Sequence, residues 1–175
     1  MICIASLIGK AKRGDRDAFT ALIEQHKEML YNTAMLLLRN EDDALDAVQD
    51  AILSCWEELP ALKHTQYFKT WLTRILLNKC YDCLRFRKHF AEPGADFEPG
   101  VETDWDTGLD VGQALERLPQ MDQVVLSLFY YDGFRTKEIA KALSISDEAV
   151  RVRLSRSRNR FKKILTEENL YEKQS

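Results

Sequence analysis

Residues 136–165 read TKEIAKALSISDEAVRVRLSRSRNRFKKIL, and this stretch decides the fold of the second half of the chain. Its pattern predicts two helices, over 136–143 and 147–165, separated by only three residues, Ser144 to Ser146. Ser146 is well suited to cap the second helix, and the carboxylates of Asp147 and Glu148 suit its first turn. A short helix, a tight turn and a strongly basic second helix predict a helix-turn-helix.

The second of these helices has a sharply sorted surface. At roughly 100° per residue, Val150, Leu154, Phe161 and Leu165 share one sector, which we expect to pack on the domain. The opposite sector and its flanks are rich in hydrogen-bond donors: Arg151, Val152, Arg153, Ser155, Arg156, Asn159, Arg160, Lys162 and Lys163. No acidic residue follows Glu148 in this stretch, so the acid–base pairs of an ordinary solvated helix are missing. Guanidinium groups match guanine edges and phosphates, and the pattern therefore favours duplex DNA as the partner.

Positive charge is confined to parts of a chain that is acidic overall. The 175 residues hold 25 Lys and Arg against 28 Asp and Glu. Residues 91–110 contain seven acidic residues, no basic one, two prolines and three glycines, without apolar periodicity. This composition predicts a flexible acidic linker. We therefore expect two small domains, residues 1–90 and 111–170, joined by the linker 91–110.

The first domain reads as helical throughout. Apolar residues recur every three or four positions, which predicts helices over 17–39, from Asp42 or Asp43 to Pro60, and over 66–89. On the second of these helices we expect the inward stripe to be Leu45, Val48, Ile52, Trp56 and Leu59.

After the linker, Asp110 is suited to cap a short helix that ends at Leu118-Pro119, and another helix should close at Asp132-Gly133. No stretch alternates strictly between apolar and polar residues. The predicted fold class is all-α.

Several ordered signatures resemble one known family. They are the segment Asp43-Ala-Leu-Asp-Ala-Val-Gln-Asp50, the pattern Phe68-x-x-Trp71-Leu72-x-x-Ile75-x-x-Asn78, and the stretch from Leu118-Pro119 to Arg156. Together they resemble the extracytoplasmic-function (ECF) sigma factors of bacterial RNA polymerase, a group of the sigma-70 family. The resemblance covers roughly residues 10–165. It departs from the family at Arg135, where a small capping residue is usual, and at Ser144, where the turn usually has glycine.

The resemblance implies a role for each domain. Asp46, Gln49 and Asp50 would contact core polymerase, and the compact polar face that their spacing makes on a helix agrees with this. The loop 61–67 and the helix after it would read the melted -10 promoter element, with Lys63, His64, Asn78, Lys79 and Arg85 as the contact candidates and Arg87 and Lys88 beside them. Arg151, Val152, Arg153, Ser155, Arg156 and Asn159 would read the -35 element as duplex.

Other kinds of site have little support in the sequence. Cys80 and Cys83 lie inside a predicted helix without a second Cys or His pair at zinc spacing, so we expect buried thiols rather than a metal or redox site. No nucleophile–base arrangement, glycine-rich phosphate loop or metal-ligand cluster is evident. We therefore expect no enzyme activity, cofactor or metal.

The N-terminal apolar run, residues 2–8, is too short to span a bilayer. We expect a soluble, cytoplasmic protein that does not insert into membranes.

The sequence leaves two functions open. The first is a sigma factor that binds core RNA polymerase and promoter DNA and that is held inactive by an anti-sigma protein. The second is a helix-turn-helix transcription regulator that acts without core polymerase. Residues 1–90 carry the docking and promoter-melting signatures in order, which favours the sigma factor.

Overall fold

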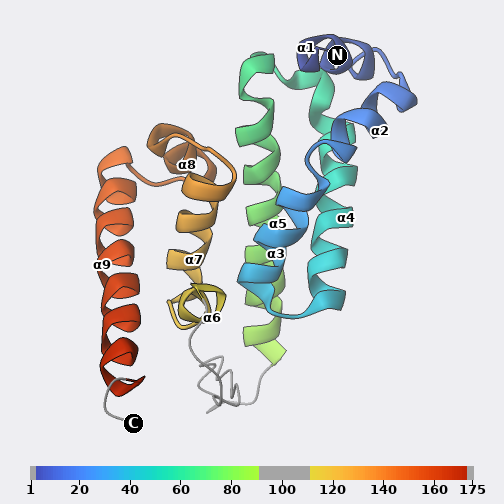
Figure 1. Ribbon diagram of the computed structural model, residues 1–175. Helices are drawn as coiled ribbons and strands as arrows, with labels where there is room; N and C mark the ends of the chain where they lie inside the picture. The colour runs from blue at the N-terminus through green and yellow to red at the C-terminus, as the bar shows by residue number, and fades with distance from the viewer. Residues whose placement is uncertain (1–2, 91–110, 173–175) are drawn as a thin grey trace.

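The computed structural model describes residues 3–90 and 111–172. Within these ranges every regular element is a helix, and the predicted all-α class with a C-terminal helix-turn-helix is confirmed. The expected linker 91–110 and the expected cap Asp110 lie outside the described residues. Figure 1 shows the N-terminal helices grouped around α5 on one side and the C-terminal helices on the other, with the long α9 at the edge.

The first domain contains five α-helices and two short 3-10 turns. The helices are α1 (Ile4–Ala11), α2 (Arg16–Glu24), α3 (Lys27–Leu38), α4 (Glu41–Glu58) and α5 (Phe68–Phe90), and the turns η1 (Leu59–Ala61) and η2 (Thr65–Tyr67) connect α4 to α5. The extent of α5 agrees with the predicted helix over 66–89. Its fully buried side chains include Phe68, Leu72 and Leu76, which together anchor the core of the domain.

Two helices of the first domain differ from the sequence expectation. The single stripe predicted over 17–39 is split at Gln25-His26 into α2 and α3. Leu22 and Met29 are both buried and seven residues apart, so the apolar pattern stays in phase across the break and does not signal it. The buried His26 ring nitrogen Nδ1 lies 2.8 Å from the Leu22 carbonyl oxygen at the end of α2. In addition, residues 4–11 form α1, a helix that the sequence did not predict.

Helix α4 begins at Glu41, earlier than the expected start at Asp42 or Asp43, and buries a different face. Its cap is Asn40, whose Oδ1 accepts a hydrogen bond from the Asp43 backbone N–H at 2.9 Å. The fully packed positions are small residues, Ala44, Ala47, Ala51 and Cys55, which allow the helix to approach α3 and α5 closely. The expected inward stripe was therefore partly wrong: Val48, Ile52 and Trp56 are half-buried at its edge, and Leu45 is 42% exposed.

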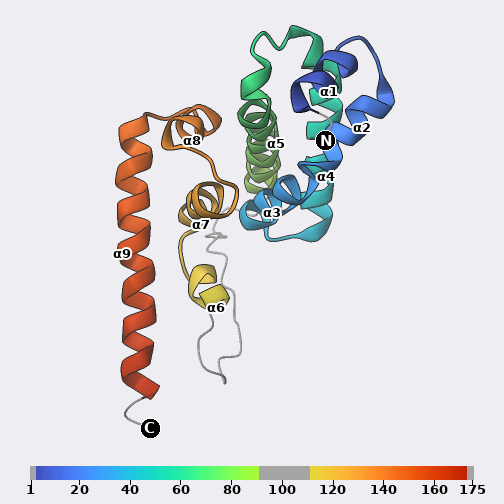
Figure 2. The same ribbon diagram turned by 45° about the horizontal axis from the view of Figure 1, so that its top comes forward.

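The second domain contains α6 (Val111–Glu116), α7 (Gln120–Leu126), α8 (Thr136–Leu143) and α9 (Asp147–Glu172), with a π-type turn η3 (Ser127–Tyr131) extending α7. This segment closes at Asp132-Gly133 as predicted, with Gly133 at φ 70°. In both ribbon views α7 and α8 lie between α9 and the first domain (Figures 1 and 2). Helix α8 packs on α5, and α7 packs on α3.

Polar contacts also join the two domains. Lys69 Nζ donates to the Asp132 carbonyl oxygen and lies 4.5 Å from the centre of the Phe134 ring. Tyr131 donates its hydroxyl hydrogen to Glu28 Oε1 at 3.1 Å. These contacts place the start of α5, which follows the predicted -10 loop, directly against the second domain.

Candidate functional site

The turn of the helix-turn-helix is held by local hydrogen bonds. Ser144 ends α8 in the left-handed conformation, with φ 57° and ψ 40°, and the Ile145 N–H donates to the Ala140 carbonyl at 3.0 Å. Ser146 Oγ accepts a hydrogen bond from the Ala149 N–H at 3.0 Å, so its predicted role as the cap of α9 is confirmed. At Arg135 the missing capping side chain is partly replaced by Glu138, whose Oε2 accepts from the Arg135 backbone N–H at 2.8 Å.

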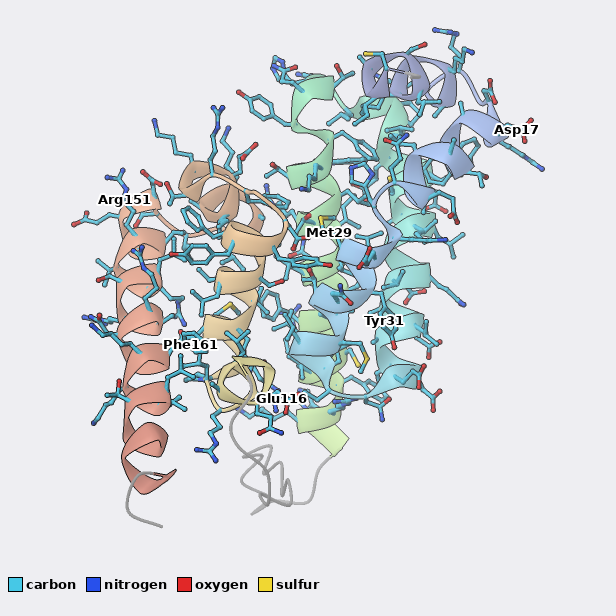
Figure 3. All side chains as sticks on the ribbon, in the orientation of Figure 1. Asp17, Met29, Tyr31, Glu116, Arg151 and Phe161 are labelled. Carbon is cyan, nitrogen blue, oxygen red and sulfur yellow. The ribbon has the colours of Figure 1, made fainter. Side chains whose placement is uncertain are left out.

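Helix α9 turns most of its predicted contact residues to the solvent. Val150, Leu154 and Ser157 are buried, and the other side of the helix presents exposed residues: Val152, Ser155, Arg156 and Asn159. Figure 3 shows the side chains of α9 projecting from the edge of the molecule, with Phe161 on the side that faces α7. This surface, Val152, Ser155, Arg156 and Asn159, is called the outer face of α9 below.

Arg153 is placed differently from the expectation. Its Nη1 donates to Oδ1 of Asp122 at 3.2 Å, and Arg160 Nη1 donates to Oδ2 of the same carboxylate at 2.6 Å. Asp122 belongs to α7 and is 1% exposed. Arg153 is therefore paired with α7 from the flank of the outer face, while 42% of its side chain remains exposed. The helical wheel ranked Arg153 as flanking but could not reveal its partner, which lies 31 residues earlier in the chain.

The arginines on the other flank of α9 also have partners. Arg151 pairs with Asp147 one turn earlier, and its Nε donates to Asp147 Oδ2 at 3.1 Å. Arg158 Nη1 donates to the Tyr130 hydroxyl at 3.2 Å. Arg156, by contrast, makes no ion pair with any residue in the described ranges, so its guanidinium is available to an external partner.

The predicted -10 loop is exposed and held from two directions. Lys63 and His64 are exposed, and the rings of His64 and Tyr67 lie 6.2 Å apart in an edge-on arrangement. On one side, Lys12 Nζ from the loop after α1 donates to the Leu62 carbonyl oxygen at 2.6 Å. On the other side, Lys141 Nζ from α8 lies 4.3 Å from the centre of the Tyr67 ring. Neither lysine could be linked to the loop from sequence spacing.

The candidate contact residues of α5 do not all share one face. Asn78 and Arg85 are exposed and seven residues apart, so they lie on the same side of the helix, whereas Lys79 is half-buried. Arg74, four residues before Asn78, is exposed on the same face and was missed, although its spacing could have identified it. Arg85 pairs with Asp82.

Two further basic residues near the end of α5 have different environments. Arg87 donates to the Leu38 carbonyl at 3.0 Å and pairs with Asp43, so it fastens α5 to the α3–α4 junction. Lys88 is exposed.

The predicted polymerase-contact residues form an acidic face on α4. Asp46, Gln49 and Asp50 are all exposed. Leu53, one turn further along, is 61% exposed and was not singled out from the sequence. Carboxylates repel phosphates, so this face is unfavourable for nucleic acid.

The four cysteines differ in exposure: Cys55 and Cys80 are buried, Cys83 is half-buried and Cys3 is exposed, so the expectation of buried thiols holds for Cys80 and not for Cys83. Burial raises the pKa of Cys80 to about 12 and that of Cys55 to about 12, so both are protonated near neutral pH. Burial also raises the pKa of Cys83. Across residues 3–90 and 111–172, no group of three or more His, Cys, Asp or Glu is arranged to hold a metal ion. In the same part of the chain, no helix has the length and apolar character needed to cross a membrane.

Sequence comparisons assign both domains to one family. The model of sigma-70 region 2 matches residues 22–90, and the model of sigma-70 region 4 matches residues 109–161. The chain is 32% identical to the ECF RNA polymerase sigma factor SigM of Mycobacterium tuberculosis, over 92% of this chain and 84% of the relative. The chain belongs to the ECF group of sigma-70 family sigma factors. This sigma factor is also 32% identical to RNA polymerase sigma factor NccH of Alcaligenes xylosoxydans xylosoxydans, over 91% of this chain and 93% of the relative.

Solved structures agree with this membership. The sigma factor resembles CnrH, in the structure of CnrH in complex with the cytosolic domain of CnrY, with a TM-score of 0.66 and 26% identity over 91% of this chain and 95% of that chain. RpoE of Bartonella quintana, in complex with the anti-sigma factor NepR, shares the fold with a TM-score of 0.66 over 85% of this chain and 96% of that chain, at 24% identity. Both halves match sigma factors, so the regulator acting without polymerase is not favoured.

Proposed function

We propose that this sigma factor directs core RNA polymerase to promoters by dividing the work between its two domains. Residues 1–90 dock on polymerase and capture the melted -10 element, residues 91–110 act as the tether, and residues 111–170 read the -35 element as duplex. The sigma factor itself carries out no catalysis. The observation that supports this division best is the separation of charge: an acidic exposed face on α4 and a basic exposed face on α9, in different domains.

The outer face of α9 is suited to a major groove. Arg156 offers a planar fork for a guanine edge, Ser155 and Asn159 offer polar groups, and Val152 offers methyl groups to a thymine methyl. Arg151 stands beside this face with a side chain that is 66% exposed and, once released from its half-buried partner Asp147, is suited to a phosphate. The phosphate would replace the charge of Asp147 as the partner of the Arg151 guanidinium.

The -10 element is proposed to meet the loop 61–67 and one face of α5. Unpaired bases are bound through stacking and through hydrogen bonds to their edges. His64 and Lys63 can supply such groups from the loop, and Asn78 and Arg85 can supply them from the helix. Lys79 is proposed to support this surface through its charge from a half-buried position.

Polymerase docking is proposed to use Asp46, Gln49 and Asp50. Two weak contacts in separate domains reinforce each other when a linker joins them, because the first contact raises the effective concentration of the second. The acidic balance of the whole chain limits binding to bulk DNA, because nonspecific affinity depends on neutralising phosphates.

We also propose that an anti-sigma protein holds this sigma factor inactive. The support is the similarity to CnrH, which has been solved in complex with the cytosolic domain of CnrY. The test is to purify the full chain from its host with its bound proteins and to add each of them to the transcription assay below. A partner that abolishes the new transcripts supports the proposal, and partners without effect contradict it.

The central experiment mixes the purified chain with core RNA polymerase from its own host and a genomic promoter pool. We expect co-elution with core and transcripts that start at discrete sites, from which the -35 and -10 preferences follow. Failure to bind core or to create new start sites, with a footprint on duplex DNA by the chain alone, would contradict the sigma mechanism and support the independent regulator.

A further inference from the structure

The carboxylate of Asp122 occupies an unusual position in the second domain. It lies in the first turn of α7 and is 1% exposed, in a segment whose neighbours Val124 and Val125 are fully buried. Charged groups are seldom buried unless they are paired, because removing a charge from water is costly. A buried carboxylate of this kind requires positively charged partners. Both oxygens of Asp122 accept hydrogen bonds from arginines.

The two arginines come from the helix that is proposed to read DNA. Arg153 and Arg160 are seven residues apart, which is two turns, so they leave α9 on the same side. Arg153 Nη1 lies 3.2 Å from Asp122 Oδ1, and Arg160 Nη1 lies 2.6 Å from Asp122 Oδ2. One carboxylate thus connects two successive parts of α9 to α7, and two points of attachment fix both the rotation of the helix and its tilt.

This attachment borders the outer face of α9. On the helical wheel Arg153 and Arg160 lie between the buried stripe of Val150, Leu154 and Ser157 and the outer face, and Arg156 follows them at the edge of that face. If α9 rotated about its own axis by one residue step, about 100°, a different side chain would take the position of Arg156 in the DNA groove. The direction in which Arg156 points therefore depends on what prevents that rotation.

We propose that Asp122 is a positioning residue that clamps the recognition helix through Arg153 and Arg160, and that Arg153 serves this clamp and does not contact promoter bases. The inference rests on the proposed function of α9 in reading the -35 element. Turning the Arg153 guanidinium from Asp122 to a base edge would break its bond and leave one oxygen of a buried carboxylate without that partner, which is unfavourable. Arg156 carries no such cost, since it has no ion-pair partner in the described parts of the chain.

The first test is a double-mutant cycle on thermal unfolding of the full chain, with Asp122→Asn, Arg153→Gln and the double variant. Each single change is expected to lower Tm, and the double change should lower it by less than the sum. Arg153→Lys, which keeps a cation for Asp122, should recover part of the loss. Additive effects of the two substitutions, or no change in Tm with Arg153→Gln, would overturn the clamp.

The second test measures base preference, which a purely structural role would not alter. Holoenzyme is bound to a duplex library in which the -35 element of a selected promoter is randomised, at a temperature where every variant is folded. Arg156→Gln is expected to lose about tenfold discrimination at one base pair, equal to about 1.4 kcal/mol. Asp122→Asn should weaken discrimination at that same base pair, with little further loss in the double variant Asp122→Asn/Arg156→Gln. Arg153→Lys should keep the preference of the unmodified chain.

The outcomes separate the clamp from the proposed function. A new relaxed position with Arg153→Lys, at a base pair that Arg156→Gln does not affect, would show that Arg153 reads a base and would overturn the inference. Asp122→Asn with unchanged discrimination would likewise overturn positioning. If Arg156→Gln leaves every preference intact, or holoenzyme selects no promoter, the reading role of α9 fails and positioning fails with it, while the Tm cycle still decides whether the clamp holds the helix.

Discussion

The two domains of this sigma factor are stabilised by different kinds of contacts. In the first domain, large apolar side chains such as Leu22, Leu30 and Leu76 are fully buried in a core shared by α2, α3 and α5. The second domain also has an apolar core, which includes Val150 and Leu154 of α9, and this helix is held in addition through a buried carboxylate and two arginines. The hydrophobic effect is non-directional, whereas hydrogen-bonded charge pairs are directional. The second domain therefore adds a directional attachment of α9 to its apolar packing.

The two proposed binding faces differ in the same way. On α4 the acidic residues Asp46 and Asp50 stand on a helix whose packing depends on small buried residues behind them. On α9 the outer face is bordered by arginines that are already engaged with Asp122, Asp147 and Tyr130. Substitutions in one domain should leave the stability and the contacts of the other unchanged.

The largest effect is expected from a cavity in the first core. Leu76→Ala removes a fully buried side chain from α5 and should cost about 3 kcal/mol of unfolding free energy. Leu53→Ala makes the same change at a position 61% exposed and should stay within about 0.5 kcal/mol. Urea unfolding followed by tryptophan fluorescence in a Trp105→Phe background reports on the first domain, which holds Trp56 and Trp71. Equal costs for the two leucines would contradict the proposed core.

An intermediate effect is expected from pH in the first domain. Burial lowers the pKa of His26 below its usual 6.5. The hydrogen bond with the Leu22 carbonyl opposes this shift, and the positive charge of Lys69 lowers the pKa by a smaller amount. The unfolded chain then binds a proton more readily than the folded one, so stability is full above about pH 6.5 and falls as pH drops below it. Each unit of lowering corresponds to about 1.4 kcal/mol once the pH is below both values.

The measurement compares urea unfolding of the Trp105→Phe chain at pH 7 and pH 5 with that of the same chain carrying His26→Gln. The chain with His26 should lose more stability than the Gln variant, which lacks the titrating ring. Identical losses would show that His26 titrates normally in the folded state.

The smallest effect is expected at the turn of the second domain. Ser144 has φ 57°, a left-handed conformation that glycine adopts without strain. Ser144→Gly should therefore stabilise the helix-turn-helix by about 0.5 kcal/mol, the relief of strain being partly offset by the greater freedom of the unfolded chain. Ser155→Gly places the same change in the interior of α9 and should destabilise by a similar amount. Hydrogen exchange in α8 and α9 measures both, and a loss of protection with Ser144→Gly would contradict the strain argument.

Much of the fold could be predicted because periodicity and capping are local. The extent of α5, the cap at Ser146 and the closure at Gly133 all follow from neighbouring residues. The break between α2 and α3 could not be predicted, because Leu22 and Met29 remain in phase across it. The inward face of α4 was misjudged because the wheel favoured large apolar residues, while close helix packing selected alanines.

The candidate site was predictable to the extent that it depends on one helix. The exposed positions of Asp46, Gln49, Asp50 and Arg156 agree with the spacing argument, although their contacts with polymerase and DNA remain predictions. The pairing of Arg153 with Asp122 and the bond from Lys12 to Leu62 join residues far apart in the chain. Such contacts depend on tertiary structure, which no local pattern contains.

The division of labour between the domains is tested most directly by two substitutions in one assay. Asp50→Arg and Arg156→Ala are each titrated with core polymerase, and promoter binding is then measured at concentrations that saturate core. Arg156→Ala should weaken promoter binding and leave core binding intact, whereas Asp50→Arg should weaken core binding and leave the promoter affinity of the assembled holoenzyme unchanged. If either substitution reduces both affinities equally, the two faces do not act separately and the account is contradicted.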